Sequence, residues 1–200
     1  MPVFGLTGGV ATGKSTFTQA LLLEKPIAVF DSDRCVHELL AGDESVRDAV
    51  TVAFGREALN DAGWPERCKL REIVFTDASR RKTLEAILHP VVRSRWTAEA
   101  AEARRTHAWL LVDIPLLYET GVAGEFDRVI VVASSRSAQL QRLTERRGLA
   151  PELAARMIAA QLDLGIKIQQ SDHLIWNDST VPNLAGQVRH LARWLARRYA

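Results

Sequence analysis

The segment Gly8–Ser15 constrains the fold of this chain more than any other part of its sequence. It reads Gly-Gly-Val-Ala-Thr-Gly-Lys-Ser and matches the pattern G-x-x-x-x-G-K-[ST] at every fixed position. An apolar run, Val3–Thr7, precedes the motif, and helix-forming residues follow it from Ser15 to Leu23. The motif therefore lies between a predicted strand and a predicted helix, which is the context that a phosphate-binding loop requires.

The chemistry of such a loop points to a nucleoside triphosphate. Its glycines let successive backbone N–H groups turn toward phosphate oxygens, and the dipole of the following helix adds to the attraction. Lys14 would place a mobile positive charge on the outer phosphates, and the hydroxyl of Ser15, or alternatively of Thr16, would bind Mg²⁺. The alternative is a structural glycine-rich turn with an exposed lysine. We expect the nucleotide to contact Gly8, Gly9, Ala11, Thr12, Gly13, Lys14, Ser15 and Thr16.

The rest of the chain alternates apolar runs with helical patterns. Further strands are predicted at 27–30, 109–112, 129–132 and 173–176. Helices are predicted at about 34–54, 80–105, 136–147, 151–163 and 181–198, and the segment 55–69 has the weakest pattern. The strands are apolar throughout and do not alternate with polar residues, which favours a parallel sheet covered on both faces. We therefore predict an α/β fold with a doubly wound, five-stranded parallel sheet.

Composition excludes several other classes of protein. The 200 residues include 26 Lys and Arg against 24 Asp and Glu, and 47% are hydrophobic, as in a globular protein of one domain. The longest apolar runs are far shorter than the roughly 20 residues that cross a bilayer. The first residues lack the features of a secretory signal, so we expect a cytoplasmic location, with Cys35 and Cys68 as reduced thiols. The net charge of +2 favours no nucleic-acid partner.

Acidic residues follow two of the predicted strands. In open α/β sheets, ligands bind beyond the carboxyl ends of the strands, where Asp31-Ser32-Asp33 and Asp113 stand. A kinase needs one carboxylate to orient and deprotonate the acceptor hydroxyl, and others to hold hydrated Mg²⁺. The alternatives are structural: Asp31 or Ser32 could cap a helix that begins near Arg34, and Asp113 could cap a helix before Pro115.

The residues favour a small-molecule kinase among nucleotide-binding proteins. A GTPase would need an Asn-Lys-x-Asp motif for the base, and Asn177-Asp178 lacks the lysine. A GTPase would also have Asp-x-x-Gly after a strand, whereas Ile114-Pro115-Leu116 follows Asp113. An oligomeric ATPase motor usually needs a longer chain.

Arginines are concentrated toward the C-terminal half of the chain. Arg142 and Arg146 are four residues apart, on one face of a predicted helix, where they could close over a triphosphate. The alternative is a solvated helix face. Arg189, Arg193 and Arg197 form a second stripe, for which a solvated face is favoured over a nucleic-acid surface because no aromatic interleaving accompanies it.

Several further motifs resemble those of the dephospho-coenzyme A kinases. The resemblance begins with residues 6–16 and continues through Asp31-Ser32-Asp33, Phe75, Leu84-Glu85, His89-Pro90 and Asp113-Ile114-Pro115-Leu116-Leu117-Tyr118-Glu119. It extends further along the chain through Gln139, Arg142, Arg146, Gly148, Arg156, Gln161, Lys167, Asp172 and Asn177. The combination of Asp-Ile-Pro-Leu-Leu-Tyr-Glu with His-Pro and Asp-x-Asp is specific, whereas the phosphate loop alone is generic.

The resemblance implies ATP-dependent phosphorylation of the ribose 3′-hydroxyl of dephospho-coenzyme A, with Mg²⁺. It implies a core at about 1–33, 108–135 and 168–200, a helical acceptor-side insert at about 34–107, and a lid at about 136–167. Asp33 would act as base or orienting group, with Lys14 and Arg142 as the other catalytic residues. Arg142 and Arg146 would contact ATP, and Ser15 and Asp113 would serve the metal. The acceptor would contact Asp33, His89, Pro90, Leu116, Tyr118 and Glu119, with Arg71 or a neighbour near it.

Some positions depart from the pattern of the family. Ala11, Ser32 and Ser171 stand where the family commonly has Gly, Ala and Ala, and Trp176 and Asp178 are unusual near the expected adenine site. Ala11 requires either a negative φ or a strained backbone. We expect a monomer or a weak homo-oligomer without nucleic acid or membrane partners. The alternatives are another nucleotide or small-metabolite kinase of the same fold, or a nucleotide-dependent binding switch.

Overall fold

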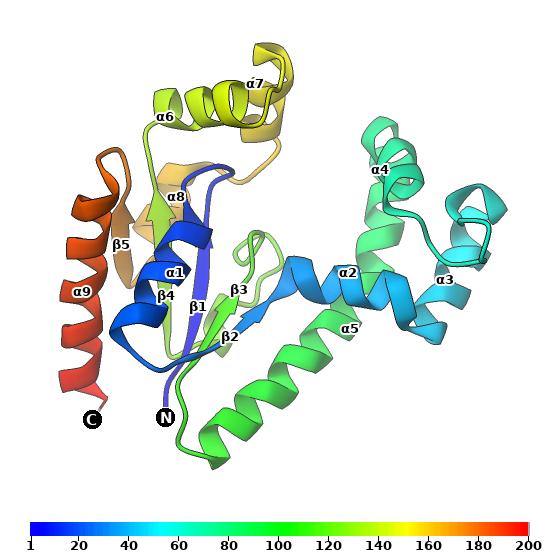
Figure 1. Ribbon diagram of the computed structural model, residues 1–200. Helices are drawn as coiled ribbons and strands as arrows, with labels where there is room; N and C mark the ends of the chain where they lie inside the picture. The colour runs from blue at the N-terminus through cyan, green and yellow to red at the C-terminus, as the bar shows by residue number, and fades with distance from the viewer. Residues whose placement is uncertain (200) are drawn as a thin grey trace. The chain divides into compact units, whose positions relative to one another are not determined.

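The five predicted strands form one parallel sheet, as Figure 1 shows. The structure is a computed structural model that describes residues 1–199, apart from the side chain of Thr76. Within it the strands lie in the order β2-β3-β1-β4-β5. Their bounds are Val3–Gly8 for β1, Ala28–Asp31 for β2, Leu110–Asp113 for β3, Arg128–Ala133 for β4 and His173–Trp176 for β5. The predicted α/β class is confirmed.

The helices agree with the predicted pattern in most places. Their bounds are Lys14–Glu24 (α1), Ser32–Gly42 (α2), Glu44–Phe54 (α3), Arg67–Thr76 (α4), Ala78–Arg105 (α5), Arg136–Gln141 (α6), Pro151–Ala159 (α7), Leu164–Gln169 (α8) and Val181–Arg198 (α9). A π-helical turn, Arg142–Arg146, continues α6. The pattern predicted at 34–54 is divided at Asp43, whose carboxylate accepts the Val46 N–H and caps α3. Neither α4 nor α8 was predicted.

The chain forms two compact units. One contains residues 1–30 and 100–199, with the whole of α1, α6 to α9 and most of the sheet, and the other is Asp31–Glu99. The helix α5 belongs to both units. The predicted lid segment, 136–167, lies within the first unit. The division into core, insert and lid otherwise stays a prediction.

One face of the sheet is buried beneath α1 and α9, which lie side by side in Figure 1. The core there is built from apolar side chains of the sheet, α1 and α9, among them Phe4, Phe17, Trp109, Ile130 and Leu191. On the opposite face Gly5 leaves room for Leu117 and Phe126, which a Cβ at this position would contact at 2.7 and 2.8 Å. Among the described residues, no helix has the length and apolar character needed to span a membrane.

Candidate active site

The phosphate loop lies at the carboxyl end of the central strand β1 and leads directly into α1. Its last glycine, Gly13, is the N-cap residue of α1 and has a φ of 100°. A side chain there would be strained, and its Cβ would overlap the amide of Asn177. No side chain caps the start of α1, so its first N–H groups remain available, and such groups bind anions.

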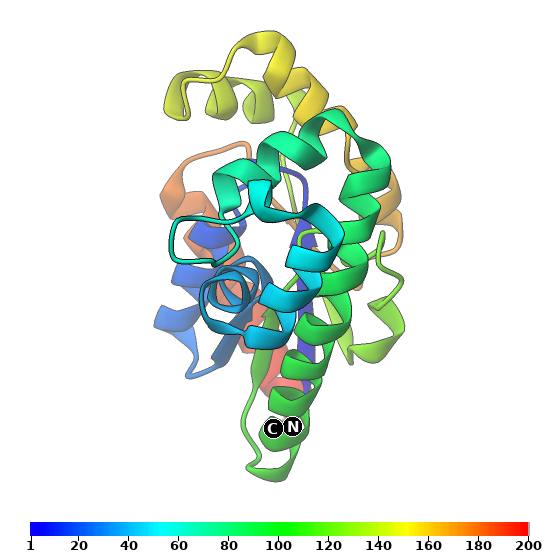
Figure 2. The same cartoon turned by 90° about the vertical axis from the view of Figure 1, so that its right-hand side faces the viewer.

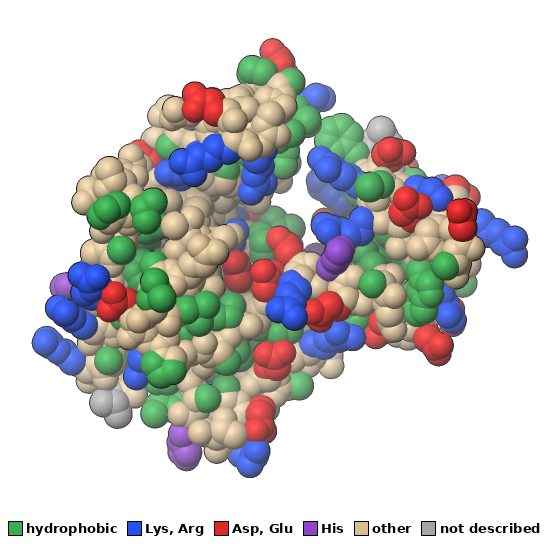
Figure 3. Space-filling model, in the orientation of Figure 1, with side chains coloured by type: hydrophobic (Ala, Val, Ile, Leu, Met, Phe, Trp, Pro, Cys, Tyr) green, Lys and Arg blue, Asp and Glu red, His purple; other side chains and the backbone are tan. Residues whose placement is uncertain are grey.

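A pocket of about 310 Å³ opens in front of this loop. In Figure 3 Lys and Arg side chains gather on the lower side of the segment that contains α6 and α7. The pocket is lined by Gly9, Ala11, Thr12, Gly13, Lys14, Ser15, Thr16, Arg142, Arg146, Arg147, Asn177, Ser179, Val181 and Leu184. Three arginines and one lysine converge with a helix N-terminus, which gives the pocket the charge that a polyphosphate requires.

Lys14, the first residue of α1, lies close to Asp113, the last residue of β3. The ammonium of Lys14 is 4.0 Å from a carboxylate oxygen of Asp113, and both side chains are about 15% exposed. Asp113 is the last residue of β3, and residues 115–121, which follow it closely, consist of turns. Asp113 therefore does not cap a helix, and its predicted role toward the metal stays a prediction.

Four polar side chains hold the backbone of the phosphate loop, and we call them the loop clamp: Gln139, Arg142, Gln161 and Asn177. Gln139 donates to the carbonyl of Val10 at 2.8 Å, and Gln161 accepts the N–H of the same residue at 2.7 Å. Asn177 donates to the carbonyl of Thr12 at 2.8 Å. The resemblance named Gln139, Gln161 and Asn177 without a role, and the contacts now give them one: they position the loop.

Arg142 also binds the backbone of the loop. Its guanidinium donates to the carbonyls of Ala11 at 3.1 Å, Thr12 at 3.2 Å and Asn177 at 2.5 Å. Burial lowers the pKa of Arg142, and the charge of Arg146 lowers this pKa further, while Asp178 opposes them. In this structure Arg142 thus supports the loop backbone. The predicted contact with the transferred phosphoryl group stays a prediction, as does that of the exposed Arg146.

Ala11 has a φ of 58°, in the left-handed region that favours glycine. Because the family commonly has glycine here, the sequence left two possibilities for Ala11, a negative φ or a strained backbone. The positive φ shows that the backbone of Ala11 is strained. A left-handed conformation costs an L-residue roughly 1–2 kcal/mol. Replacing alanine by glycine makes the unfolded chain more flexible, and this added entropy lowers stability by about 0.4–1 kcal/mol.

We therefore expect Ala11→Gly to raise the free energy of unfolding by about 0.5 kcal/mol, because strain relief exceeds the added entropy of the unfolded chain. Urea unfolding without nucleotide measures this change. Ala101→Gly is the matched control, since Ala101 is an exposed residue within α5 and should lose about 1 kcal/mol instead. Equal losses in both variants would contradict the strain at Ala11.

The two carboxylates of Asp31-Ser32-Asp33 have different positions. Asp31 accepts the N–H of Arg34 at 3.0 Å and is the N-cap of α2, so the structural alternative holds for this residue. Asp33 lies in the first turn of α2, and its side chain is exposed. Asp33 is not the capping residue of α2, and its predicted role toward the acceptor stays a prediction.

The segment after β3 is anchored by a buried ion pair. The ammonium of Lys167, which is 0% exposed, lies 2.8 Å from a carboxylate oxygen of Glu119 and donates to the carbonyl of Pro115 at 3.1 Å. The same oxygen of Glu119 accepts the N–H of Leu162. Glu119 thus has a structural contact that the sequence did not predict, and its role toward the acceptor stays a prediction.

The other predicted acceptor residues have different surroundings. The hydroxyl of Tyr118 is buried, and burial together with the charge of Asp172 raises its pKa to about 12. Leu116 is partly buried in the same segment. His89 and Pro90 are exposed on α5, in the second unit with Asp33. None of these positions tests the predicted contacts with the acceptor.

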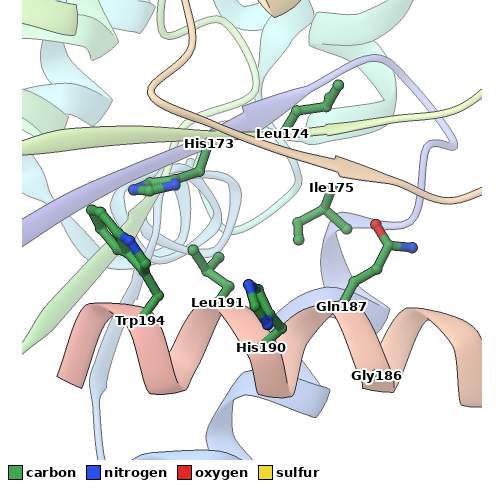
Figure 4. A pocket seen from close by; sticks show the side chains of 8 residues that line it. All are labelled: His173, Leu174, Ile175, Gly186, Gln187, His190, Leu191 and Trp194. Atoms are coloured by element: carbon green, nitrogen blue, oxygen red, sulfur yellow. The ribbon is translucent and has the colours of Figure 1, made fainter. Parts of the chain in front are cut away.

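A second hollow lies between β5 and α9, where Figure 4 shows its side chains. Its volume is about 620 Å³, and Gln187 donates to and accepts from the backbone of Trp176 at its rim. The lining residues are His173, Leu174, Ile175, Gly186, Gln187, His190, Leu191 and Trp194, none of which is Lys or Arg. Burial lowers the pKa of His173, which disfavours its charged form. This hollow therefore lacks the charges that a triphosphate needs.

Sequence reasoning missed several residues of the pocket at the loop. Arg147 lies at the end of the π-helical turn, and Ser179, Val181 and Leu184 follow β5. The rule that ligands bind beyond the carboxyl ends of parallel strands could have indicated the last three.

Together, the parallel sheet, the phosphate loop at its central strand and the Lys14–Asp113 pair define a small P-loop kinase. A family model for dephospho-CoA kinase matches residues 2–183. The chain belongs to the dephospho-CoA kinase family. Membership implies ATP-dependent phosphorylation of dephospho-CoA, the last step of coenzyme A biosynthesis, and confirms the class of enzyme predicted from the sequence.

Known relatives agree with this assignment. The chain is 39% identical to the dephospho-CoA kinase of Symbiobacterium thermophilum over 197 residues, which cover 98% of this chain and 81% of the relative. It is 39% identical to that of Geobacillus kaustophilus over 177 residues, 88% of each chain. The solved dephospho-CoA kinase from Campylobacter jejuni has a TM-score of 0.74 at 24% identity, with 99% of this chain and 98% of that chain covered, and shows the same fold.

Proposed function

We propose that this protein transfers the γ-phosphoryl group of ATP to the ribose 3′-hydroxyl of dephospho-CoA, with Asp33 as the base or orienting carboxylate. The observation that carries the nucleotide half of the proposal is the pocket in which the phosphate loop, Lys14 and Asp113 converge. The observation that supports the acceptor half is the exposed carboxylate of Asp33 in the first turn of α2.

The loop would bind the phosphates through backbone N–H groups and the ammonium of Lys14. Lys14 would neutralise charge that develops on the leaving phosphate, while the loop clamp keeps the N–H groups in a fixed arrangement. As the 3′-oxygen of the acceptor bonds to the γ-phosphorus and the bond from that phosphorus to ADP breaks, Asp33 would accept the proton of the 3′-hydroxyl. Arg146 and Arg147 line the same pocket and would add positive charge beside the transferring group.

The donor set also fits a magnesium ion. Ser15 offers a hydroxyl at the start of α1, and Asp113 offers a carboxylate beside Lys14, and both are the oxygen ligands that Mg²⁺ prefers. When bound, Mg²⁺ would neutralise charge on the β and γ phosphates.

The adenine of ATP would lie near the start of α9. Val181 and Leu184 supply apolar surface to the pocket there, and Asn177 and Ser179 supply polar groups. Trp176 departs from the family pattern. Its backbone N–H donates to the side chain of Gln187, and its carbonyl accepts a hydrogen bond from the same side chain. Asp178 accepts the Ser135 N–H at 2.6 Å and so fixes the start of α6.

The test is a coupled assay of ADP release with dephospho-CoA, nucleoside monophosphates and shikimate as acceptors. We expect dephospho-CoA to be preferred in kcat/KM by roughly 10²-fold or more, because the acceptor site would otherwise leave polar groups unpaired. Phosphorus NMR of the product should show a 3′-phosphate. Equal rates with all acceptors, or none above the rate without acceptor, would reject the proposal. The latter result would favour a nucleotide-dependent switch.

We further propose a monomer or weak homo-oligomer, located in the cytoplasm. The two cysteines, Cys35 and Cys68, are free thiols, which agrees with a reducing compartment. On α9, Arg189, Arg193 and Arg197 are exposed, and Arg189 pairs with Glu24 at 3.0 Å. A solvated face explains this stripe without a nucleic-acid partner.

A further inference from the structure

Lys167 carries a charge in the interior of the first unit. Its side chain is 0% exposed, although a charged lysine is almost never fully buried without a partner. The ammonium lies 2.8 Å from a carboxylate oxygen of Glu119 and donates to the carbonyl of Pro115 at 3.1 Å. Apolar residues of similar volume often stabilise a fold as well as a buried ion pair does. Stability is therefore a weak reason for this lysine, and its contacts indicate another.

Both partners of Lys167 belong to the segment that follows Asp113. Asp113 ends β3, and Pro115 and Glu119 come shortly after it in the chain. The carbonyl of Pro115 also accepts the hydroxyl of Thr7 at 3.0 Å. Thr7 is 0% exposed and directly precedes the phosphate loop. Because one carbonyl oxygen can accept two hydrogen bonds, it joins Lys167 to the strand that leads into the loop.

The residues just before α8 make a second connection. The N–H of Leu162 donates at 3.0 Å to the same oxygen of Glu119 that pairs with Lys167. The neighbouring Gln161 accepts the N–H of Val10, in the phosphate loop, at 2.7 Å. Figure 2 shows α8 beside the segment that follows β3. The end of the predicted lid therefore contacts both the phosphate loop and the segment after β3.

These contacts close on themselves, and we call them the contact ring. Leu162 joins Gln161 to Glu119 within it. All of its residues lie in the first unit. Because each contact fixes one segment relative to the next, a break at one point should loosen the others. The members of the contact ring, in order, are Thr7, Val10, Gln161, Glu119, Lys167 and Pro115.

From this ring we infer that Lys167 is a positioning residue for phosphoryl transfer, which acts through Pro115 to hold Asp113 in place beside Lys14. The inference rests on the function proposed above. The ammonium of Lys14 lies 4.0 Å from the carboxylate of Asp113. The contact ring fixes the backbone close to both residues, at Pro115 after Asp113 and at Val10 before Lys14. A displacement of about 1 Å among catalytic groups can cost roughly 10²-fold in rate.

The first test separates turnover from nucleotide binding in Lys167→Met. The variant keeps the length of the side chain and removes its charge and its donors. We expect kcat with dephospho-CoA to fall about tenfold or more, because the catalytic groups lose their alignment. The Kd for ATP, measured by calorimetry, should change less than about threefold, because the loop N–H groups and Lys14 remain. Assays well below the thermal midpoint keep the variant folded, so a purely structural role would leave kcat unchanged.

Thr7 tests the same carbonyl with a conservative pair of variants. Thr7→Val removes the hydroxyl at nearly the same size, and Thr7→Ser keeps it. We expect Thr7→Val to lower kcat roughly fivefold and Thr7→Ser to retain most of it. In the double variant Thr7→Val with Lys167→Met, the loss should be smaller than the product of the single losses, because both residues act through Pro115. The Thr7 pair also tests the inference if Lys167→Met does not fold.

Hydrogen exchange tests the contact ring without turnover. The N–H of Val10 is bound to Gln161, so Lys167→Met should speed its exchange about fivefold or more in the free protein, although Val10 does not bind Lys167. Lys25→Met is the matched control. Lys25 lies in the same unit, against the ring of Trp109, and its loss should change neither kcat nor the exchange at Val10.

Three results would overturn the positioning role. They are an unchanged kcat in both Lys167→Met and Thr7→Val, independent losses in the double variant, and unchanged exchange at Val10 in Lys167→Met. A loss of ATP affinity as large as the loss of kcat would also overturn it, in favour of a role in nucleotide binding. Absence of phosphorylation of dephospho-CoA by the wild type would instead reject the proposed function, and the exchange experiment would still test the contact ring.

Discussion

Replacing Asp33 by Asn should lower kcat with dephospho-CoA roughly 10²-fold or more while the KM for ATP changes only a few-fold. The variant keeps the size and polarity of the side chain and removes its negative charge and its ability to accept a proton. Asp33 lies in the first turn of α2 and is exposed, so the fold does not depend on its burial. A steady-state ADP-release assay under saturating ATP measures kcat, and varying ATP gives its KM.

The neighbouring carboxylate supplies the matched control for this variant. Asp31→Asn makes the same chemical change two residues away, at the N-cap of α2, where Asn is as good a cap as Asp. We expect it to retain turnover and stability. If Asp33→Asn kept full activity, Asp33 would be a helix-terminal carboxylate and not a base. If only Asp31→Asn lost turnover, the two roles would have to be exchanged.

The sequence predicted the sheet and the phosphate loop well because both depend on local patterns. Each strand is a continuous apolar run, and the loop is a contiguous motif between a strand and a helix. The helices α4 and α8 escaped prediction for different reasons. α8 has only six residues, too few to establish a period, whereas α4 follows directly on Gly63 and Pro65, which normally indicate irregular structure.

The contacts of the loop clamp could not be predicted in the same way because they join residues that are far apart in the sequence. Gln161 lies 151 residues from Val10 along the chain, and Asn177 lies 165 residues from Thr12. The sequence showed that these side chains are polar, but only the fold shows which backbone groups they bind. The same holds for Arg142, whose charge suggested a phosphate contact and whose guanidinium binds three carbonyl groups. The position of Ala11 in the phosphate loop indicated that its backbone could be strained, but only the structure gives the φ that shows the strain.

The buried ion pair is the second site at which one substitution should have a large effect. We expect Glu119→Gln to lower the free energy of unfolding by about 3 kcal/mol, because it leaves the ammonium of Lys167 buried without a counter-charge. Lys167→Met should cost less, about 1–2 kcal/mol, since it removes the buried charge and leaves Glu119 partly exposed, where water can solvate it. Urea unfolding followed by circular dichroism, with m-values compared, measures both changes.

A surface pair and a double variant separate this effect from the mere loss of a salt bridge. Glu24→Gln breaks the more exposed pair with Arg189 and should cost less than about 0.5 kcal/mol. The double variant Glu119→Gln with Lys167→Met should be more stable than Glu119→Gln alone, because the uncompensated charge is then absent. If Lys167→Met were the more damaging single change, the carbonyl of Pro115 and packing around the lysine stem, and not the desolvated charge, would dominate the stability of the segment between Asp113 and Glu119.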